Sequence, residues 1–389
     1  MLNLDPTFIS LPLLALIFLS IPMHSKSFVS RYGAWYLLFL SLHFYFLAAG
    51  IKQFILILAL AIITRFAAKQ NTQLTFVFAT LTLCGFLIAS KWLIAFDDSN
   101  PLHIFIPLGI SFFTFEFIHY LTEVKKGSVQ VGRARDFYLF SFFFPTVVSG
   151  PIKRVQDFTK QLTHITSPSH DLVVLSFQRI GLGVVYKFVA DYLVSQQELA
   201  HPRLGNLGAA QIYVFFIIIS MRIFLDFAGY SLIAIGLAGL YGINVPQNFR
   251  SPYFSFSLID FWNRWHISLS SWVRDYLYIP LGGSRRGKLK QSVNLLLAML
   301  VIGLWHGFGT NFMIWGLYHG LGLTVNHMWR LKFTKTNFVS KEWPQLVNCC
   351  KIFTVFTFVS IGWLFFFYPT AEAISIFGYF ITAIWSLKL

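Results

Sequence analysis

The stretch "NLLLAMLVIGLWHGFGTNFMIWGLYHG", residues 294–320, decides the fold class of this chain. It contains no Asp, Glu, Lys or Arg, and its two imidazoles belong to His306 and His319. About 20 helical residues cross the hydrocarbon core of a bilayer, so such a run predicts helices at membrane depth. The two histidines are functional candidates, because ionisable groups inside a membrane normally face a protein interior or a cavity.

The rest of the chain is also rich in apolar residues and poor in charged ones. Of its 389 residues, 12% are charged and 56% are hydrophobic, whereas soluble domains carry about 25% charged residues. We therefore expect an all-α polytopic membrane protein with roughly 10 to 12 helices, some too short to cross, because backbone groups in lipid must bond within helices. The expected segments are 7–23, 33–49, 51–66, 74–96, 101–121, 136–150, 172–197, 209–243, 292–312, 312–329, 350–368 and 370–387.

Two of these segments have interruptions. The segment 136–150 is short and contains Pro145, which favours a re-entrant path. The segment 209–243 is long enough for two helices, with an expected break near Gly229. No internal repeat is visible, so we expect one membrane domain over residues 1–389.

The net charge of +15 comes mostly from lysines and arginines in short loops between apolar segments. This distribution is typical of the positive-inside rule, and it disfavours nucleic-acid binding because no basic tail or separate polar domain is present. The rule predicts that the loops 122–135 and 285–290 face the cytoplasm and that the N-terminus faces outward. The three cysteines lack metal-ligand spacing, and no metal site is expected.

The segment 258–279 is amphipathic when wound as one helix that stops before Pro280. The pattern permits an interfacial helix with tryptophan anchors, or a helix whose polar side lines a wet cavity. One stripe is aromatic and aliphatic: Leu258, Trp262, Trp265, Leu269, Trp272, Tyr276 and Ile279. The opposite stripe is polar: Asn263, His266, Ser270 and Arg274, with Asp260, Arg264, Ser271 and Asp275 beside it.

Buried imidazoles suit proton transfer. Desolvation lowers the pKa of a histidine, and a neutral imidazole is the form that acts as a general base. For His306 and His319, catalysis and simple helix packing remain equally open, since Gly303, Gly307, Gly316 and Gly320 flank them at four-residue spacing and permit close helix contact. The chain has no GxSxG, Walker A, HExxH or HxxxxD motif.

Four motifs resemble the membrane-bound O-acyltransferase family. They are "FFPTVVSGPIKR" (143–154), "LDFAGYSLIAIGLAGLYGINVPQNF" (225–249), "FWNRWHISLSSWVRDYLYIPLGG" (261–283) and "GLWHG…GLYHG" (303–320). They look like the bacterial branch that holds the alginate O-acetyltransferase membrane subunit and the teichoic-acid D-alanyl transfer protein. The strongest resemblance covers residues 102–320.

The resemblance implies a ring of helices around a central tunnel in the cytoplasmic (inner) membrane of a bacterium. It implies catalytic roles for His306, in the WHG motif, and His266, in the RWHxS motif. Substrate-binding or tunnel-lining roles would fall to Asn263, Arg264, Ser270, Arg274, Asp275, Trp305, His319, Asp226 and Ser231. The basic residues Arg285, Arg286, Lys288 and Lys290 would help to dock an acidic donor.

The implied function is O-acyl transfer across the membrane without a bound cofactor. The donor would be a cytoplasmic thioester, acetyl-CoA or an acyl carrier protein. The acceptor would be a hydroxyl of a partner protein or an extracytoplasmic polysaccharide. The stretch "PLGGSRRGK" (280–288) favours acetyl transfer, whereas "FPTVVSGPIKR" (144–154) and the compact length favour D-alanyl transfer to teichoic acid. A transporter or proton channel using His266, His306 and Glu116, or a scaffold for a soluble acyltransferase, stays an alternative.

Overall fold

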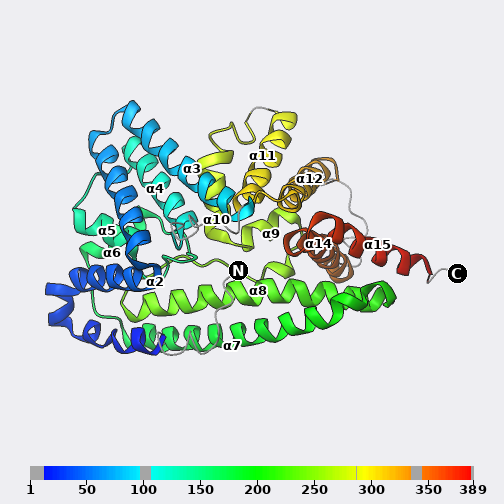
Figure 1. Cartoon of the computed structure of the whole chain (residues 1–389), viewed down its shortest axis with the longest axis horizontal. Helices are drawn as coiled ribbons and strands as arrows, with labels where there is room; N and C mark the ends of the chain where they lie inside the picture. Colours follow the sequence, from blue (N-terminus) through cyan, green and yellow to red (C-terminus); the bar gives the residue numbers. More distant parts are fainter. Residues whose placement is uncertain (1–12, 97–106, 286, 334–343, 387–389) are drawn as a thin grey trace. The chain divides into compact units, whose positions relative to one another are not determined.

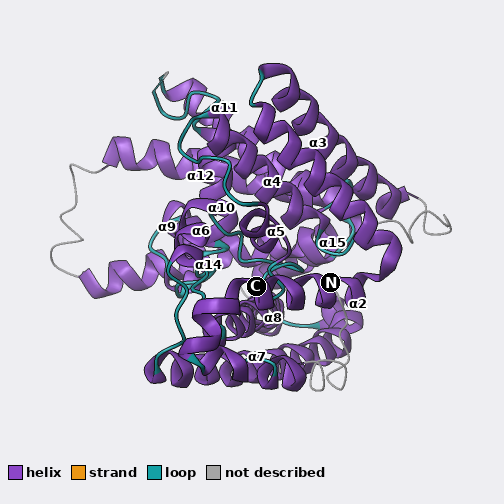
Figure 2. Cartoon of the chain, turned by 90° about the vertical axis from the view of Figure 1, so that its left-hand side faces the viewer, coloured by secondary structure: helices purple, strands orange, loops and turns teal. Residues whose placement is uncertain are grey.

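The computed structural model describes residues 13–96, 107–285, 287–333 and 344–386. All secondary structure in these ranges is helical, and none of them contains a strand (Figure 2). The chain divides into two compact units, which we describe separately. The first unit comprises Met1–Phe188 and Gly229–Gln247, and the second comprises Val189–Ala228 and Asn248–Leu389. The expected single domain and its ring-like arrangement stay predictions.

Figure 1 labels the helices. The first unit contains η1 (Ile21–His24), α2 (Lys26–Gln70), α3 (Gln73–Phe96), α4 (Ile110–Lys125), α5 (Ala134–Phe142) and α6 (Val155–Thr163). Two helices contribute residues to both units: α7 (His170–Ala200) and α8 (Ala209–Leu240). The second unit continues with η3 (His201–Asn206), η4 (Pro252–Phe254), α9 (Leu258–Arg264), α10 (Ile267–Val273), the π-helical turn η5 (Arg274–Tyr278), α11 (Lys288–His306), α12 (Thr310–Phe333), α14 (Pro344–Phe367) and α15 (Thr370–Ser386).

Six helices in the described residues are long and apolar enough to cross a bilayer. They are α2, α3, the segment 170–206 that contains α7, α8, α11 and α14. Together with the all-helical composition, this confirms the predicted class of polytopic membrane protein. The start of the expected span 7–23 and the beginning of 101–121 lie outside the described residues.

The glycines of the first unit explain one confirmed boundary and one wrong prediction. Gly50 has non-helical angles, φ 77° and ψ 166°, and it separates the two predicted segments 33–49 and 51–66 by a kink within α2. The predicted break near Gly229 is wrong, because α8 is continuous there. Gly229 instead permits close packing: a Cβ atom at this position would lie 2.8 Å from the backbone oxygen of Gly183 on α7.

The helix α5 ends at Phe142, before Pro145, and its nine residues are too short to cross a membrane, as the sequence predicts.

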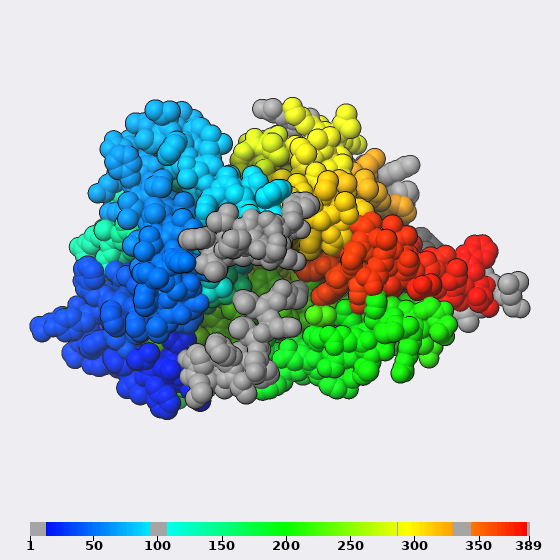
Figure 3. Space-filling model, viewed as in Figure 1, coloured from blue at the N-terminus to red at the C-terminus, as the bar shows by residue number. Residues whose placement is uncertain are grey.

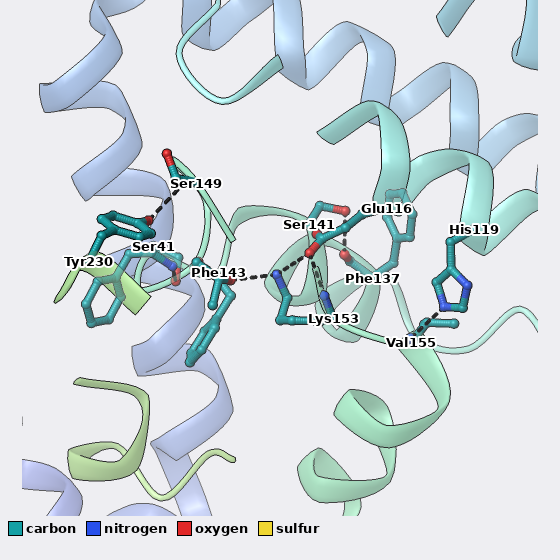
Figure 4. Close-up of polar contacts among 12 residues, drawn as sticks. Ser41, Glu116, His119, Phe137, Ser141, Phe143, Ser149, Lys153, Val155 and Tyr230 are labelled. Atoms are coloured by element: carbon teal, nitrogen blue, oxygen red, sulfur yellow. Dashed lines mark hydrogen bonds and ion pairs between the residues drawn. The ribbon is translucent and has the colours of Figure 1, made fainter. Parts of the chain in front are cut away.

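A buried ion pair stabilises the connection after α5. Lys153 Nζ donates to Glu116 Oε1 at 2.7 Å and to Thr146 Oγ1 at 2.8 Å, and both charged side chains are almost fully buried (Figure 4). Burial of both charges together makes a structural ion pair the natural role for Glu116, rather than the proton relay of the channel alternative.

In the second unit, α11 and α12 form a tightly packed helical hairpin. They lie side by side in Figure 1, and their surfaces adjoin that of α14 in Figure 3. A Cβ atom on Gly303 would collide with the backbone oxygen of Phe312, and one on Gly316 would lie 2.6 Å from the backbone oxygen of Met299. Glycine is therefore required at both positions, and the predicted close helix contact is confirmed.

Candidate active site

The predicted continuous helix over residues 258–279 is wrong. It is divided into α9, α10 and the π-helical turn, with a break at Trp265 and His266. His266 adopts left-handed angles, φ 43° and ψ 54°, which are uncommon for a residue with a Cβ atom. A neighbouring irregular segment bonds to both sides of this break: Asn248 O accepts from Ile267 N at 2.9 Å, and Arg250 N donates to Arg264 O at 3.0 Å.

His266 is buried at this break, with 4% of its surface exposed. The ring of Phe227 meets it edge-on at a centroid distance of 4.6 Å. Within the described part of the chain, its Nε2 atom is buried and has no hydrogen-bond partner. Burial lowers the pKa of His266 to about 3, so the imidazole is neutral at pH 7.

His306 is the last residue of α11, which ends there because Gly307 adopts an extended conformation. The imidazole is half-buried in an aromatic pocket. Its centroid lies 4.4 Å from the ring of Trp305, 4.8 Å from that of Phe366 and 5.4 Å from that of Trp315.

Both predicted catalytic histidines lie near the indole ring of Trp305. Its indole lies 6.4 Å from the ring of His266 and 4.4 Å from that of His306, measured between centroids. Residues from the α9–α10 break and from the end of α11 thus meet at the same indole. The structure thus places the two predicted catalytic histidines beside Trp305, one of the predicted tunnel-lining residues.

A cavity of about 560 Å³ lies within the second unit, and His266, Trp305 and His306 are not among its lining residues. Three predicted substrate-binding residues, Asn263, Ser270 and Arg274, line it. Ile267, which directly follows His266, and Ile302, one helical turn before His306, also contribute to its wall. The remaining lining residues are Arg250, Ile259, Asp260, Trp262, Ser271, Val273, Tyr278, Gln291, Leu295, Ala298, Met299, Leu323 and His327.

Three predicted site residues, Arg264, Arg274 and Asp275, take part in ion pairs beside the cavity. Arg264 Nε donates to Asp260 Oδ1 at 2.8 Å, and Asp275 Oδ1 accepts from Arg274 Nε at 2.9 Å. Neither Arg264 nor Asp275 lines the cavity itself. The guanidinium group of Arg264 orients Asp260, and the carboxylate of Asp275 orients Arg274. Asp260 and Arg274 both line the cavity.

The other predicted residues are more scattered. His319 is fully buried on α12, and its ring nitrogens have no hydrogen-bond partner among the described residues. It packs against Trp262 and Trp315, with centroids 5.3 Å and 5.0 Å away. Asp226 is half-buried on the part of α8 that belongs to the second unit. Ser231 is buried in the first unit, so its proposed contact with substrate stays a prediction.

The predicted donor-docking cluster directly precedes the cavity-lining part of α11. Arg285, Lys288 and Lys290 are exposed, whereas Arg286 lies outside the described residues. Gln291 and Leu295, on the first turns of the same helix, line the cavity. The chain therefore places exposed positive charge next to the residues that form the cavity.

Sequence reasoning missed several residues of this site. Arg250, Gln291 and His327 line the cavity, and Asn248 holds the break at His266. Asn248 lies within the motif 225–249, and both Asn248 and Arg250 belong to the irregular "NVPQNFR" stretch after α8, which is polar and contains Pro246. No group of three or more His, Cys, Asp or Glu side chains in the described ranges is arranged to hold a metal ion.

Comparison with known proteins gives this geometry its context. The family model described as "MBOAT, membrane-bound O-acyltransferase family" matches residues 16–370. The chain belongs to the membrane-bound O-acyltransferase family. The match includes both histidines, the cavity and the whole α11–α12 hairpin.

Three curated relatives illustrate the range of the family. A probable alginate O-acetylase of Pseudomonas aeruginosa is 38% identical over 272 residues, which cover 68% of this chain and 49% of the relative. A peptidoglycan O-acetyltransferase of Helicobacter pylori is 31% identical over 295 residues, 69% of this chain and 55% of the relative. A teichoic acid D-alanyltransferase of Bacillus subtilis is 32% identical over 330 residues, 77% of this chain and 80% of the relative. The chain spans about half the length of the alginate O-acetylases that it matches.

Proposed function

We propose that this protein is an O-acyltransferase that moves an acyl group from a thioester donor to a hydroxyl acceptor. The observation that carries the proposal is the placement of His266 and His306 beside Trp305, together with a cavity whose wall contains Ile267, the residue after His266, and Ile302, one helical turn before His306. Its volume of about 560 Å³ falls within the range of small-molecule sites, roughly 300–1,000 Å³.

His306 is the proposed general base. Its neutral imidazole accepts the proton of the acceptor hydroxyl, and the hydroxyl oxygen attacks the thioester carbonyl carbon. When the carbon–sulfur bond breaks, the protonated imidazole returns this proton to the leaving thiolate. The product is an ester, and the imidazole is regenerated for the next cycle.

His266 is the proposed stabiliser of the oxyanion. A neutral imidazole has one N–H donor, and a donor fixed in a buried site stabilises negative charge on the carbonyl oxygen without reorganisation of solvent. Its low pKa keeps the ring neutral, and its Nε2 atom has no partner in the described residues. Asn263 and Ser270, which line the cavity, offer further hydrogen bonds.

The proposed donor is acetyl-CoA or an acyl carrier protein, used as a substrate rather than as a resident cofactor. Both donors carry phosphate groups. Arg250 and Arg274 line the cavity, and Arg285, Lys288 and Lys290 are exposed nearby in the chain. Complementary charge of this kind accelerates the encounter with an anionic partner.

The proposed acceptor is a hydroxyl of an extracytoplasmic polysaccharide or of a partner acyltransferase. Acetyl is the first proposed acyl group, because the alginate and peptidoglycan relatives are named as acetyl-transferring enzymes. D-alanyl is the second, because the chain covers 80% of the length of the teichoic acid D-alanyltransferase. The proposed location is the inner membrane of a bacterium, with the N-terminus outside.

The test is acyl transfer by the purified protein in lipid nanodiscs. Acetyl-CoA, acetyl carrier protein and D-alanyl carrier protein are offered separately with a hydroxylated polymer, and thiol release and ester formation are measured together. We expect equal amounts of thiol and ester with at least one donor. Proton flux in proteoliposomes without ester formation would instead support the channel alternative, and absence of both activities would support the scaffold alternative.

A further inference from the structure

The break that presents His266 is held by a residue that does not belong to the proposed catalytic group. Asn248 lies in the irregular segment after α8, and it is buried with 1% of its surface exposed. Its backbone oxygen accepts from Ile267 N at 2.9 Å, and its side-chain Oδ1 accepts from Ser268 Oγ at 2.6 Å. One asparagine therefore contacts the two residues that follow His266.

The backbone oxygen of Asn248 takes the place of the usual side-chain cap of α10, because it accepts from Ile267 N in the first turn. The first backbone N–H groups of a helix lack intrahelical partners, and a serine, threonine, aspartate or asparagine at the N-cap normally accepts from one of them. Here His266 is the N-cap residue, and its side chain makes no capping hydrogen bond. Asn248 instead binds the first turn from outside, which leaves the imidazole of His266 available for another role.

The backbone pairing also explains the unusual angles of His266. Two hydrogen bonds, Ile267 N to Asn248 O and Arg250 N to Arg264 O, join the segment after α8 to the α9–α10 break. Between these two bonds the chain advances from Asn248 to Arg250 on the first side and from Arg264 to Ile267 on the second. The second side thus contains one residue more than a regular antiparallel pair. An extra residue of this kind produces a bulge, often with left-handed angles, and it redirects a side chain. His266, at φ 43°, directly precedes the second hydrogen bond of this pair.

From this geometry we infer that Asn248 is the positioning residue for His266, a role that rests on the proposed function of His266 in acyl transfer. The hydrogen bonds to Ile267 and Ser268 fix the start of α10. They thereby fix the direction in which the preceding imidazole leaves the backbone. Neither Asn248 nor His266 lines the cavity, and the proposed effect of Asn248 on the reaction passes through the position of the His266 imidazole.

The kinetic test uses both partners of the side-chain hydrogen bond. Asn248→Ala and Ser268→Ala should each lower kcat by roughly 10- to 100-fold, the size expected for a slight misplacement of a reacting group, with little change in the KM for the donor. In a His266→Asn background, neither change should cause a further loss. Ser255→Ala, which removes a buried hydroxyl that donates to Pro252 O, is the matched control and should retain full activity.

A second test does not depend on acyl transfer. Diethylpyrocarbonate modifies accessible imidazoles, and mass spectrometry gives the rate at each histidine. Modification of the buried His266 should be slow in the wild-type protein and clearly faster in Asn248→Ala and Ser268→Ala. This measurement stays valid if the purified protein transfers no acyl group, so failure of the proposed function is recognised separately.

The inference is overturned by either of two results. One is an unchanged His266 modification rate in both variants. The other is a kcat of the Asn248→Ala, His266→Asn double variant that falls by the product of the two single losses. Such a result would show that Asn248 acts independently of the imidazole. If Asn248→Ala does not fold, Ser268→Ala decides the question, because it removes only the hydroxyl group from the same hydrogen bond.

Discussion

The rings of His266 and Trp305 have centroids 6.4 Å apart, although His266 lies at the start of α10 and Trp305 near the end of α11. Trp305 directly precedes His306, whose ring it contacts at 4.4 Å. The indole therefore neighbours two imidazoles that the chain supplies from different parts of the second unit. In the proposed mechanism, His306 would accept the proton while His266 faces the carbonyl oxygen.

The first prediction concerns His306. His306→Ala should lower kcat by about 10²- to 10⁴-fold, the usual size of a general-base contribution. The imidazole is only half-buried at the end of α11, so the thermal unfolding midpoint should change little. Acyl transfer and unfolding are measured on the same purified variant, with the half-buried His201, which contacts Glu372, changed to Ala as the control. More than about a tenth of wild-type turnover would exclude the general-base role.

The second prediction contrasts His319 with His306. His319 is fully buried between Trp262 and Trp315, so replacement by alanine leaves an internal void. We expect His319→Ala to lower the free energy of unfolding by on the order of 2 kcal/mol, with a smaller effect on kcat than His306→Ala. Denaturant unfolding and kinetics of the two variants are compared. The reverse pattern, a stable His319→Ala protein without turnover, would make His319 the essential group.

The third prediction is a pH dependence of stability. The folded protein holds the pKa of His266 at about 3, whereas an unfolded histidine titrates near 6.5. Below that pH the unfolded chain binds a proton that the folded protein does not, so stability is complete above pH 6.5 and decreases as the pH falls. At pH 5 the loss from this group is roughly 2 kcal/mol.

His266→Asn tests this pH dependence, because asparagine tolerates the left-handed angles of this position. Unfolding midpoints are measured between pH 7.5 and pH 5 for both proteins. We expect the variant to lose less stability on acidification than the wild type. Parallel curves for the two proteins would show that His266 binds a proton equally well in the folded and unfolded states.

The helices follow from local sequence, whereas the break at His266 does not. Apolar runs such as 294–320 predict α11 and α12, and Gly303 and Gly316 predict their close contact, because both signals lie within the helices themselves. The apolar stripe of 258–279 continues across the break: Trp262, Trp265 and Leu269 are all buried. A helical periodicity therefore gives no sign of the interruption.

The interruption has a non-local cause. It arises from hydrogen bonds to Asn248 and Arg250, which belong to a distant irregular segment. The cavity has the same origin, because Gln291 and His327 line it only through the packing of α12 against α9 and of α11 against the π-helical turn η5. Site residues that carry their own motif, such as His306, can be found from sequence. Residues recruited by tertiary packing require the structure.

The fourth prediction concerns the donor. Arg250→Gln and Arg274→Gln should each raise the KM for the thioester donor, because each removes a positive charge from the cavity wall. Replacement of Arg285, Lys288 and Lys290 by glutamine should raise KM and weaken its dependence on salt, because exposed charges act mainly on the encounter rate. Initial rates are measured at several donor and salt concentrations. If the variants have the same KM and the same salt dependence as the wild type, these charges do not help to bind the donor. Their role would then be limited to setting the orientation of the helices in the membrane.

The last prediction concerns orientation in the membrane. The positive-inside rule places the loops 122–135 and 285–290 in the cytoplasm. Gln130 and Ser284 are exposed in these loops, whereas Thr310 is exposed beyond the opposite end of the membrane-crossing helix α11. Single cysteines at these three positions are introduced into a variant that lacks Cys84, Cys349 and Cys350.

In intact spheroplasts, a membrane-impermeant thiol reagent should label the cysteine at position 310 and spare those at 130 and 284. All three should react after lysis, which controls for accessibility. Labelling of positions 130 and 284 in intact spheroplasts, with protection of position 310, would invert the topology. The basic cluster at 285–290 would then face away from the cytoplasmic thioester, and the direction of the proposed acyl transfer would have to be reversed.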